Sequence, residues 1–248
     1  MHYDVYVVTG GIYRDRGVVS GNDFVKKASV VCAFVMILMC LCGAVGNSLS
    51  LYIYWGPSFR NRSINLLLAA LSASDLFLCI LAIPVFSITQ IQVYCPGLSH
   101  YLSGHILLFA YPVTVMLQSM SVWLLVSITI DRYLAVCHPF QVRMYCTKSR
   151  AAVTILLIVL FSIAYNFVRF WEFTLSESSE LATFEESIVP LLRGDHLFML
   201  LYQNIATLIT QFFLPLSVLG LLNLQASSNS QISMICVART MLEAGVQR

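Results

Sequence analysis

Five long apolar segments, separated by shorter polar ones, dominate the pattern of hydrophobic positions along the chain. The segments run from about Ala28 to Trp55, Ile64 to Thr89, His105 to Val136, Ala151 to Phe170 and Leu197 to Leu224. Each is long enough to cross a bilayer, since a membrane helix needs about 20 mainly apolar residues. The runs are continuous and do not alternate with a period of two, which excludes membrane β-barrel strands. The pattern therefore predicts five transmembrane α-helices, because helices satisfy their own backbone hydrogen bonds in lipid.

The composition agrees with a membrane protein. The 248 residues are 58% hydrophobic and 10% charged, with a mean hydropathy of +0.81, whereas an ordinary soluble domain is about 25% charged. The net charge of +2 comes without a basic run, so we expect no nucleic-acid partner. We find no zinc or redox cysteine pair and no hydrolase or metalloprotease motif, and we therefore expect no enzymatic activity.

The charges of the connecting segments predict an orientation in the membrane. The first connection carries Arg60 and Arg62 without an acid, and the third carries Arg143, Lys148 and Arg150. The fourth, residues 172–195, holds six acids and a single arginine. Because cytosolic loops are rich in Lys and Arg, we predict a multi-pass membrane protein with its amino terminus outside. Residues 1–27 would then be extracellular, residues 28–224 would form the bundle embedded in lipid, and residues 225–248 would be a cytoplasmic tail.

Asp75 is the single charged residue in the second apolar segment. An acid at mid-membrane depth costs about 2.5–3.5 kcal/mol and usually faces the bundle interior. Asn47 in the first segment and Ser121 in the third could meet it there. Such oxygen ligands suit a small hard cation. An acid that is protonated, or only hydrogen-bonded, fits the spacing equally well.

Several short motifs occur in a fixed order along the chain. They are Gly46-Asn47, Asn65-Leu66-Leu67-Leu68-Ala69 with Ser74-Asp75, the segment from Asp131-Arg132-Tyr133 to His138-Pro139, and Pro215. Together these motifs resemble the rhodopsin-like (class A) G-protein-coupled receptor family over roughly residues 28–224. Tyr111-Pro112, the segment from Tyr165 to Glu172, and Leu222-Asn223 are similar to those of invertebrate FMRFamide-type neuropeptide receptors.

The resemblance implies an all-α, polytopic membrane helix bundle that contains five helices of a seven-helix receptor fold. It implies three groups of site residues. Coupling to a heterotrimeric G protein would involve Asp131, Arg132, Tyr133 and Pro139. The polar core would comprise Asn47, Asp75 and Ser121, with a sodium ion at Asp75. An extracellular peptide would contact Tyr111, Thr114, Gln118, Arg169 and Glu172.

The chain differs from the family pattern after the fifth apolar segment, where no sixth or seventh segment follows. The resemblance therefore implies a receptor for an amidated, FMRFamide-type neuropeptide in the form of an incomplete chain, which would meet its G protein only if the full chain exists. Two alternatives remain open. One is a non-signalling five-span protein that associates with full-length receptors. The other is a transporter, which Asp75 alone would permit.

The predicted orientation determines the fate of one glycosylation sequon, Asn61-Arg62-Ser63. This sequon lies in a connection that we expect to face the cytosol, away from the glycosylation machinery, so we predict that Asn61 is unmodified. The protein from eukaryotic cells should migrate in a gel like its Asn61→Gln variant, before and after glycosidase treatment. A sugar-dependent shift that Asn61→Gln abolishes would contradict the orientation.

Overall fold

The computed structural model of the chain describes residues 19–56, 62–91, 106–138, 144, 146–177 and 186–229. Four long helical units come first along the chain. They are α1 (Val19–Trp55), α2 (Ser63–Ile91), η1 (Ile106–Ala110) continued by α4 (Tyr111–Cys137), and α6 (Lys148–Asn166) continued by the 3₁₀ turn η2 (Phe167–Trp171). The next helix, here called the fifth helix, begins with the π-helical stretches η4 (Phe198–Ala206) and η5 (Ile209–Phe213) and continues to Asn229.

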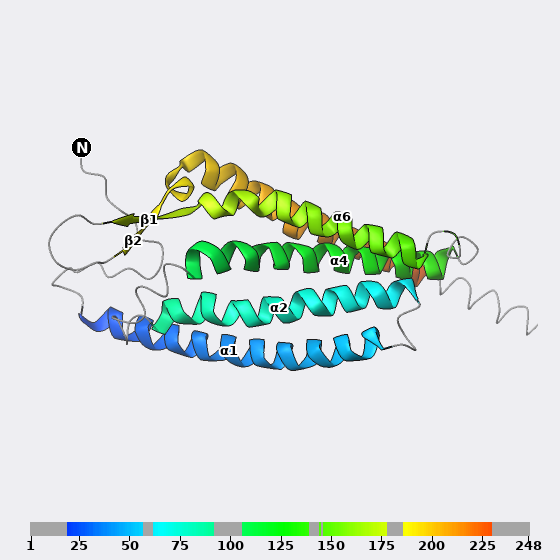
Figure 1. The fold of residues 1–248 in the computed structure, drawn as a ribbon, viewed down its shortest axis with the longest axis horizontal. Helices are drawn as coiled ribbons and strands as arrows, with labels where there is room; N and C mark the ends of the chain where they lie inside the picture. Colours follow the sequence, from blue (N-terminus) through cyan, green and yellow to red (C-terminus); the bar gives the residue numbers. More distant parts are fainter. Residues whose placement is uncertain are drawn as a thin grey trace, which may run out of the picture.

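Successive helices run in opposite directions and lie side by side as one bundle (Figure 1). α2 is central, because it packs against α1, α4 and α6, and α4 also packs against α6. The fifth helix, yellow to orange in Figure 1, returns along α6. Side-chain hydrogen bonds join it to that helix.

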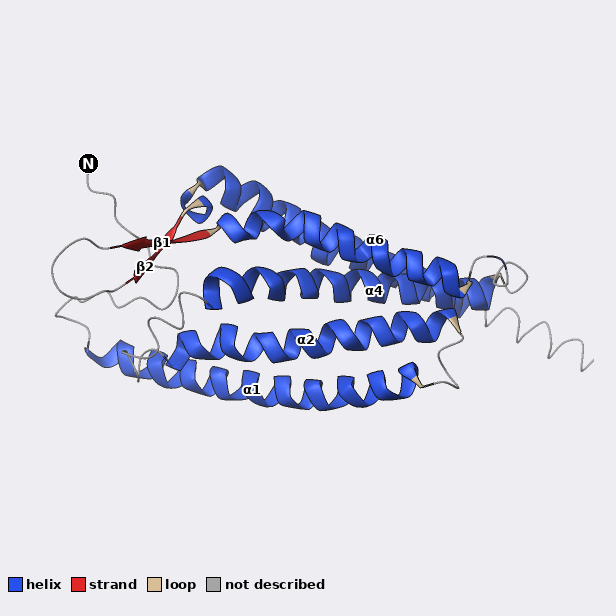
Figure 2. Ribbon diagram, viewed as in Figure 1, coloured by secondary structure: helices blue, strands red, loops and turns tan. Residues whose placement is uncertain are grey.

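A two-stranded antiparallel hairpin lies at one end of the bundle (Figure 2). It consists of β1 (Phe173–Glu177) and β2 (Glu186–Pro190), with Phe173 opposite Pro190 and Glu177 opposite Glu186. The short turn η3 (Leu192–Gly194) then leads to Asp195. The Asp195 carboxylate accepts a hydrogen bond of 2.9 Å from the backbone N–H of Leu197 and so caps the start of the fifth helix. We call this end of the bundle the hairpin end and the opposite one the Asp131 end.

The five predicted membrane spans are confirmed as helices. The described residues contain five helices long and apolar enough to cross a membrane, from Val30–Trp55 to Phe198–Asn229. The helices extend beyond the predicted segments, since α1 already begins at Val19 and the fifth helix continues to Asn229. The apolar pattern marks the part of a helix that suits lipid, and a helix continues past that part where polar residues keep helical geometry. The hairpin was not predicted.

A small apolar core joins α2, α4 and α6. It contains Leu67, Leu124, Ile128, Ala151 and Ile158, and Leu124 is completely buried. At the α1–α2 contact, a Cβ atom added to Gly43 would lie 2.8 Å from the sulfur of Cys79. Glycine at this position therefore permits the close approach of two helices that is common in membranes.

Large apolar side chains also cover the outside of the helices. Phe34, Phe77, Leu157 and Phe212 are all more than half exposed. Exposed apolar surface on this scale is far beyond what a soluble monomer tolerates. Lipid is therefore the environment that fits the outer surface of the bundle.

The buried core predicts different effects for two neighbouring leucines of α4. Leu124→Ala should lower the free energy of unfolding by about 2–4 kcal/mol, because it leaves a cavity between three helices. Leu125 is 44% exposed, so Leu125→Ala is the matched control and should have little effect. Thermal unfolding in lipid nanodiscs would measure both variants. Equal destabilisation by the two substitutions would contradict this description of the core.

Candidate functional site

A buried arginine lies at the hairpin end. Arg169 belongs to η2, the 3₁₀ turn that extends α6, and its side chain is only 3% exposed. A charged group in such a place is costly unless other groups pair with it and satisfy its hydrogen-bond donors. The contacts of its guanidinium group therefore define the polar site of this end.

The guanidinium group of Arg169 donates to side chains from three different parts of the bundle. Its Nη1 lies 2.8 Å from Oε1 of Glu172, and the two side chains form a buried ion pair. The same Nη1 donates to Oε1 of Gln203 at 2.7 Å, and Nη2 donates to the hydroxyl of Thr207 at 3.3 Å. Nε donates to Oδ1 of Asn166 at 3.3 Å, and the hydroxyl of Tyr111 lies 3.4 Å from Nη1. Arg169 thus connects η2, α4 and the fifth helix.

Further hydrogen bonds carry this polar network deeper into the bundle. The Ser119 hydroxyl of α4 accepts from Nδ2 of Asn166 at 2.8 Å and from Nε2 of Gln211 at 2.7 Å. Asn166 is completely buried, and Ser119 is 1% exposed. Near the hairpin end, the Tyr202 hydroxyl donates to the backbone carbonyl of Tyr165 at 2.6 Å. The fifth helix is thus joined to α4 and α6 through polar side chains.

Glu172 is completely buried beside Arg169. Burial raises the pKa of Glu172 above its usual value, and the nearby guanidinium groups of Arg169 and Arg193 oppose this rise. Its second oxygen, Oε2, has no hydrogen-bond partner among the described residues. The Tyr111 ring packs edge to face on Phe173, at 6.3 Å between centroids, and Arg193 lies 5.2 Å over the Phe173 ring. Two cations, one anion and two aromatic rings thus gather next to the hairpin.

The structure brings together three of the residues that the sequence singled out for ligand binding, namely Tyr111, Arg169 and Glu172. Of the other two, Thr114 is buried and donates to the carbonyl of Ala110, and Gln118 is exposed. The sequence reasoning missed the partners of Arg169 in the fifth helix. A signal for them exists, since Gln203, Thr207 and Gln211 follow each other at four-residue intervals in a largely apolar segment.

The predicted polar core lies on α1, α2 and α4. Asn47, Asp75 and Ser121 are each partly buried. The Ser121 hydroxyl pairs with the hydroxyl of Ser74 at 2.8 Å, and the structure gives the Asp75 carboxylate no hydrogen bond to any described residue. Carboxylate and hydroxyl oxygens are the kind of ligand that a hard cation such as sodium prefers. Sodium binding at Asp75 stays a prediction.

The Asp131 end contains the Asp131-Arg132-Tyr133 segment. Asp131 accepts a hydrogen bond of 3.5 Å from the Ser63 hydroxyl of α2, and the thiol of Cys146 donates to the same carboxylate. Arg132 is exposed, and Tyr133 packs edge to face on the ring of His138. Pro139, the fourth residue predicted to contact a G protein, lies outside the described residues. The roles of these four residues stay predictions.

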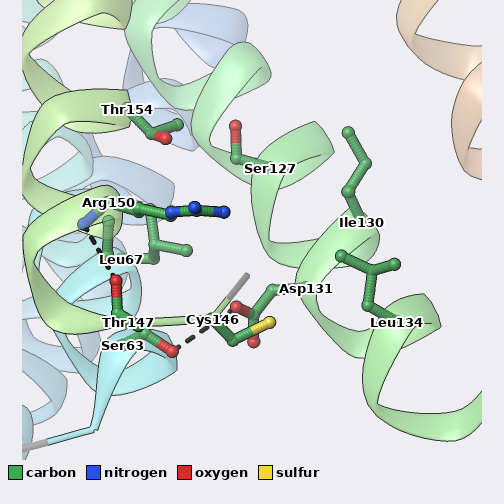
Figure 3. Close-up of a pocket in the computed structure, with 11 residues that line it drawn as sticks. Ser63, Leu67, Ser127, Ile130, Asp131, Leu134, Cys146, Thr147, Arg150 and Thr154 are labelled. Carbon is green, nitrogen blue, oxygen red and sulfur yellow. Dashed lines mark hydrogen bonds between the residues drawn. The ribbon is translucent and has the colours of Figure 1, made fainter. Parts of the chain in front are cut away.

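A cavity of about 220 Å³ opens beside Asp131, between the ends of α2, α4 and α6 (Figure 3). Asp131 and Arg150 both extend into it, so the cavity has an acidic and a basic wall. Hydroxyl groups of Ser63, Ser127 and Thr154 also line it. Burial, together with the carboxylate of Asp131, raises the pKa of the Cys146 thiol to about 11.

This bundle, apolar outside and joined inside by an apolar core and by buried polar side chains, defines a polytopic α-helical membrane protein. The model of the 7 transmembrane receptor (rhodopsin family) matches residues 46–231, which include the carboxyl-terminal part of α1 and the whole of the fifth helix. The chain belongs to the rhodopsin family of seven-transmembrane receptors. This family consists of receptors and not of enzymes.

Curated relatives agree with this family. The chain is 36% identical over 197 residues to the FMRFamide peptide receptor frpr-18 of Caenorhabditis elegans, covering 78% of this chain and 44% of that receptor. It is 32% identical over 199 residues to the FMRFamide receptor of Drosophila melanogaster, covering 78% and 36%. Similarity to the human thyrotropin-releasing hormone receptor is lower, at 26% over 161 residues, covering 64% and 38%. The chain spans less than half the length of each of these relatives.

The contact between Cys146 and Asp131 predicts slow thiol chemistry. Because the pKa of Cys146 is about 11, its alkylation rate should still rise between pH 9 and pH 11, where an ordinary thiol of pKa about 8.5 is already ionised. Asp131→Asn removes the negative charge and should speed the alkylation of Cys146 at pH 8. Mass spectrometry of the peptide that contains Cys146 would follow the reaction. A rate that levels off near pH 9, or is insensitive to Asp131→Asn, would contradict this assignment.

Proposed function

We propose that the chain forms the peptide-binding and G-protein-coupling part of a receptor for an amidated neuropeptide of the FMRFamide type. The main support is identity of 36% and 32% to two FMRFamide receptors over 78% of the chain. The proposed location is the plasma membrane, with the hairpin end outside the cell and the Asp131 end in the cytosol.

The proposed peptide site lies at the hairpin end, over Tyr111 and Phe173. These two aromatic side chains are partly exposed, so they can offer contact area to a peptide that carries phenylalanine rings. Arg169 and Glu172 lie beneath them and are almost fully buried. In this proposal the ion pair fixes the hydroxyl of Tyr111 and the neighbouring Gln203, and so shapes the floor of the site.

The proposed G-protein site lies at the Asp131 end. Arg132 is exposed there, and the adjacent Asp131 is instead held by Ser63 and Cys146. An arginine that is not held by its neighbouring acid is free to donate several hydrogen bonds to backbone carbonyls of a partner. This geometry supports coupling through Arg132.

A chimaera tests the proposal. Residues 1–229 of this chain would be joined to the remaining carboxyl-terminal part of the Caenorhabditis elegans relative and expressed in cells with a G-protein reporter. Amidated Phe-Met-Arg-Phe should bind the chimaera and activate it. The free-acid peptide should bind about tenfold more weakly or worse, because the receptor group that hydrogen-bonds the terminal amide would then be repelled by a carboxylate or left without a partner. Arg132→Ala should abolish activation while the peptide still binds.

Lys148→Ala is the matched control, because Lys148 is another exposed cation at the Asp131 end. It should leave activation nearly unchanged. A chimaera that reaches the cell surface but ignores the amidated peptide would refute the ligand class. One that binds the peptide and still signals with Arg132→Ala would refute the proposed coupling residue.

A further inference from the structure

The fifth helix begins with an unusual backbone geometry. Nine residues, Phe198–Ala206, form the π-helical stretch η4, and five more, Ile209–Phe213, form η5. π-helical turns are rare and mostly occur singly, because their i→i+5 hydrogen bonds make a looser helix than the α form. A nine-residue stretch therefore needs an external reason.

The sequence itself explains η5 better than η4. Pro215 follows η5 by two residues, and a proline both lacks an N–H donor and clashes with the carbonyl four residues earlier, here that of Gln211. No proline or glycine lies within 198–213. The stretch η4 therefore has no local residue that would break an α-helix.

The contacts of Arg169 with the fifth helix fall on η4 and the residue that follows it. Gln203 lies within η4 and accepts from Nη1 at 2.7 Å, and Thr207 accepts from Nη2 at 3.3 Å. The Thr207 hydroxyl in turn donates to the carbonyl of Tyr202, five residues earlier, at 2.9 Å. The backbone N–H of Thr207 also reaches that carbonyl, which is the π-helical pairing. Arg169 lies 5.3 Å over the Tyr202 ring.

We infer that Arg169 is a positioning residue that holds η4 in its π-helical form. It does so by binding Gln203 and, through Thr207, by stabilising the five-residue pairing at the carbonyl of Tyr202. Each α-helical residue turns the chain by about 100°. Conversion of one π-helical turn to α therefore rotates the two halves of the fifth helix by about that angle and changes the face that Gln211 and Pro215 present to the bundle. This inference does not depend on which ligand the chain binds.

The length of the fifth helix provides a direct readout. A π-helix places more residues in each turn than an α-helix, so a change to the α form lengthens the segment. Leu197 and Leu216 flank the π-helical region and are 66% and 55% exposed, which makes both positions suitable for labels. In an unbroken α-helix their Cα atoms would be about 28 Å apart. The chain has eight cysteines, so spin labels would be attached through genetically encoded ketone side chains at these two positions.

The experiment compares pulsed-EPR distances between the two labels in nanodiscs. Gln203→Leu/Thr207→Val breaks the contact from the fifth helix and leaves the Arg169–Glu172 pair intact. Arg169→Met/Glu172→Leu removes the same contact by changing its arginine, and because the acid is replaced too, no unpaired buried charge is left. Both variants should lengthen the distance by a few ångström. The matched control, Asn204→Leu/Leu208→Val, changes exposed residues of the same helix and should keep the original distance.

The outcomes distinguish a role of Arg169 in setting the geometry of η4 from a role in stability alone. Lower thermal stability with an unchanged distance in both variants would overturn it, because Arg169 would then hold the helix in place without setting its geometry. Equal lengthening in the control would also overturn it, since any substitution in η4 would then suffice. A loss of folding in one variant leaves the other to decide, because the two variants break the same contact from opposite sides.

Discussion

A guanidinium group in a low-dielectric interior has to be surrounded by acceptors, and Arg169 meets this requirement with groups from three parts of the bundle. Lipid provides no hydrophobic force that drives one helix onto another, so packing and interhelical hydrogen bonds decide association. α1, α2, α4 and α6 pack through apolar and small side chains, including Leu124 and Gly43. The fifth helix instead relies on polar contacts of Arg169, Tyr165 and Ser119. Its position therefore depends on a set of buried polar contacts, of which the Arg169 guanidinium group makes two.

The two ends of the bundle use charge in opposite ways. At the hairpin end the arginine is buried and the acid beside it is fully enclosed. At the Asp131 end the arginine is exposed, and serine and cysteine side chains hold the acid. A buried, satisfied pair favours one fixed arrangement, since breaking it costs about 3–5 kcal/mol. An exposed arginine is available to a partner, so the Asp131 end is the more adaptable of the two.

The sequence predicts those features that depend on one segment of the chain at a time. Continuous apolar runs located the five spans, and short motifs indicated the family together with Tyr111, Arg169 and Glu172 as neighbours in one site. The contacts of Arg169 with Gln203 and Thr207 could not be predicted, because they depend on how the fifth helix is rotated against α6. The hairpin also escaped prediction, since β1 alternates apolar and polar residues over only four positions and β2 does not alternate. Interhelical geometry is thus the part that sequence pattern leaves undetermined.

The buried pair also limits how a cationic peptide can be recognised. Arg169 already pairs with Oε1 of Glu172. A ligand arginine that displaced it would leave the Arg169 guanidinium group buried without its counter-ion. The same guanidinium group holds Gln203 and Thr207, so the exchange would also release the fifth helix. In the proposed site, an acid that is open to solvent is therefore better suited to attract a cationic ligand than Glu172, and Asp195 is one that is exposed. In the proposed peptide site, Glu172 would act on a ligand through the residues that it and Arg169 hold in place.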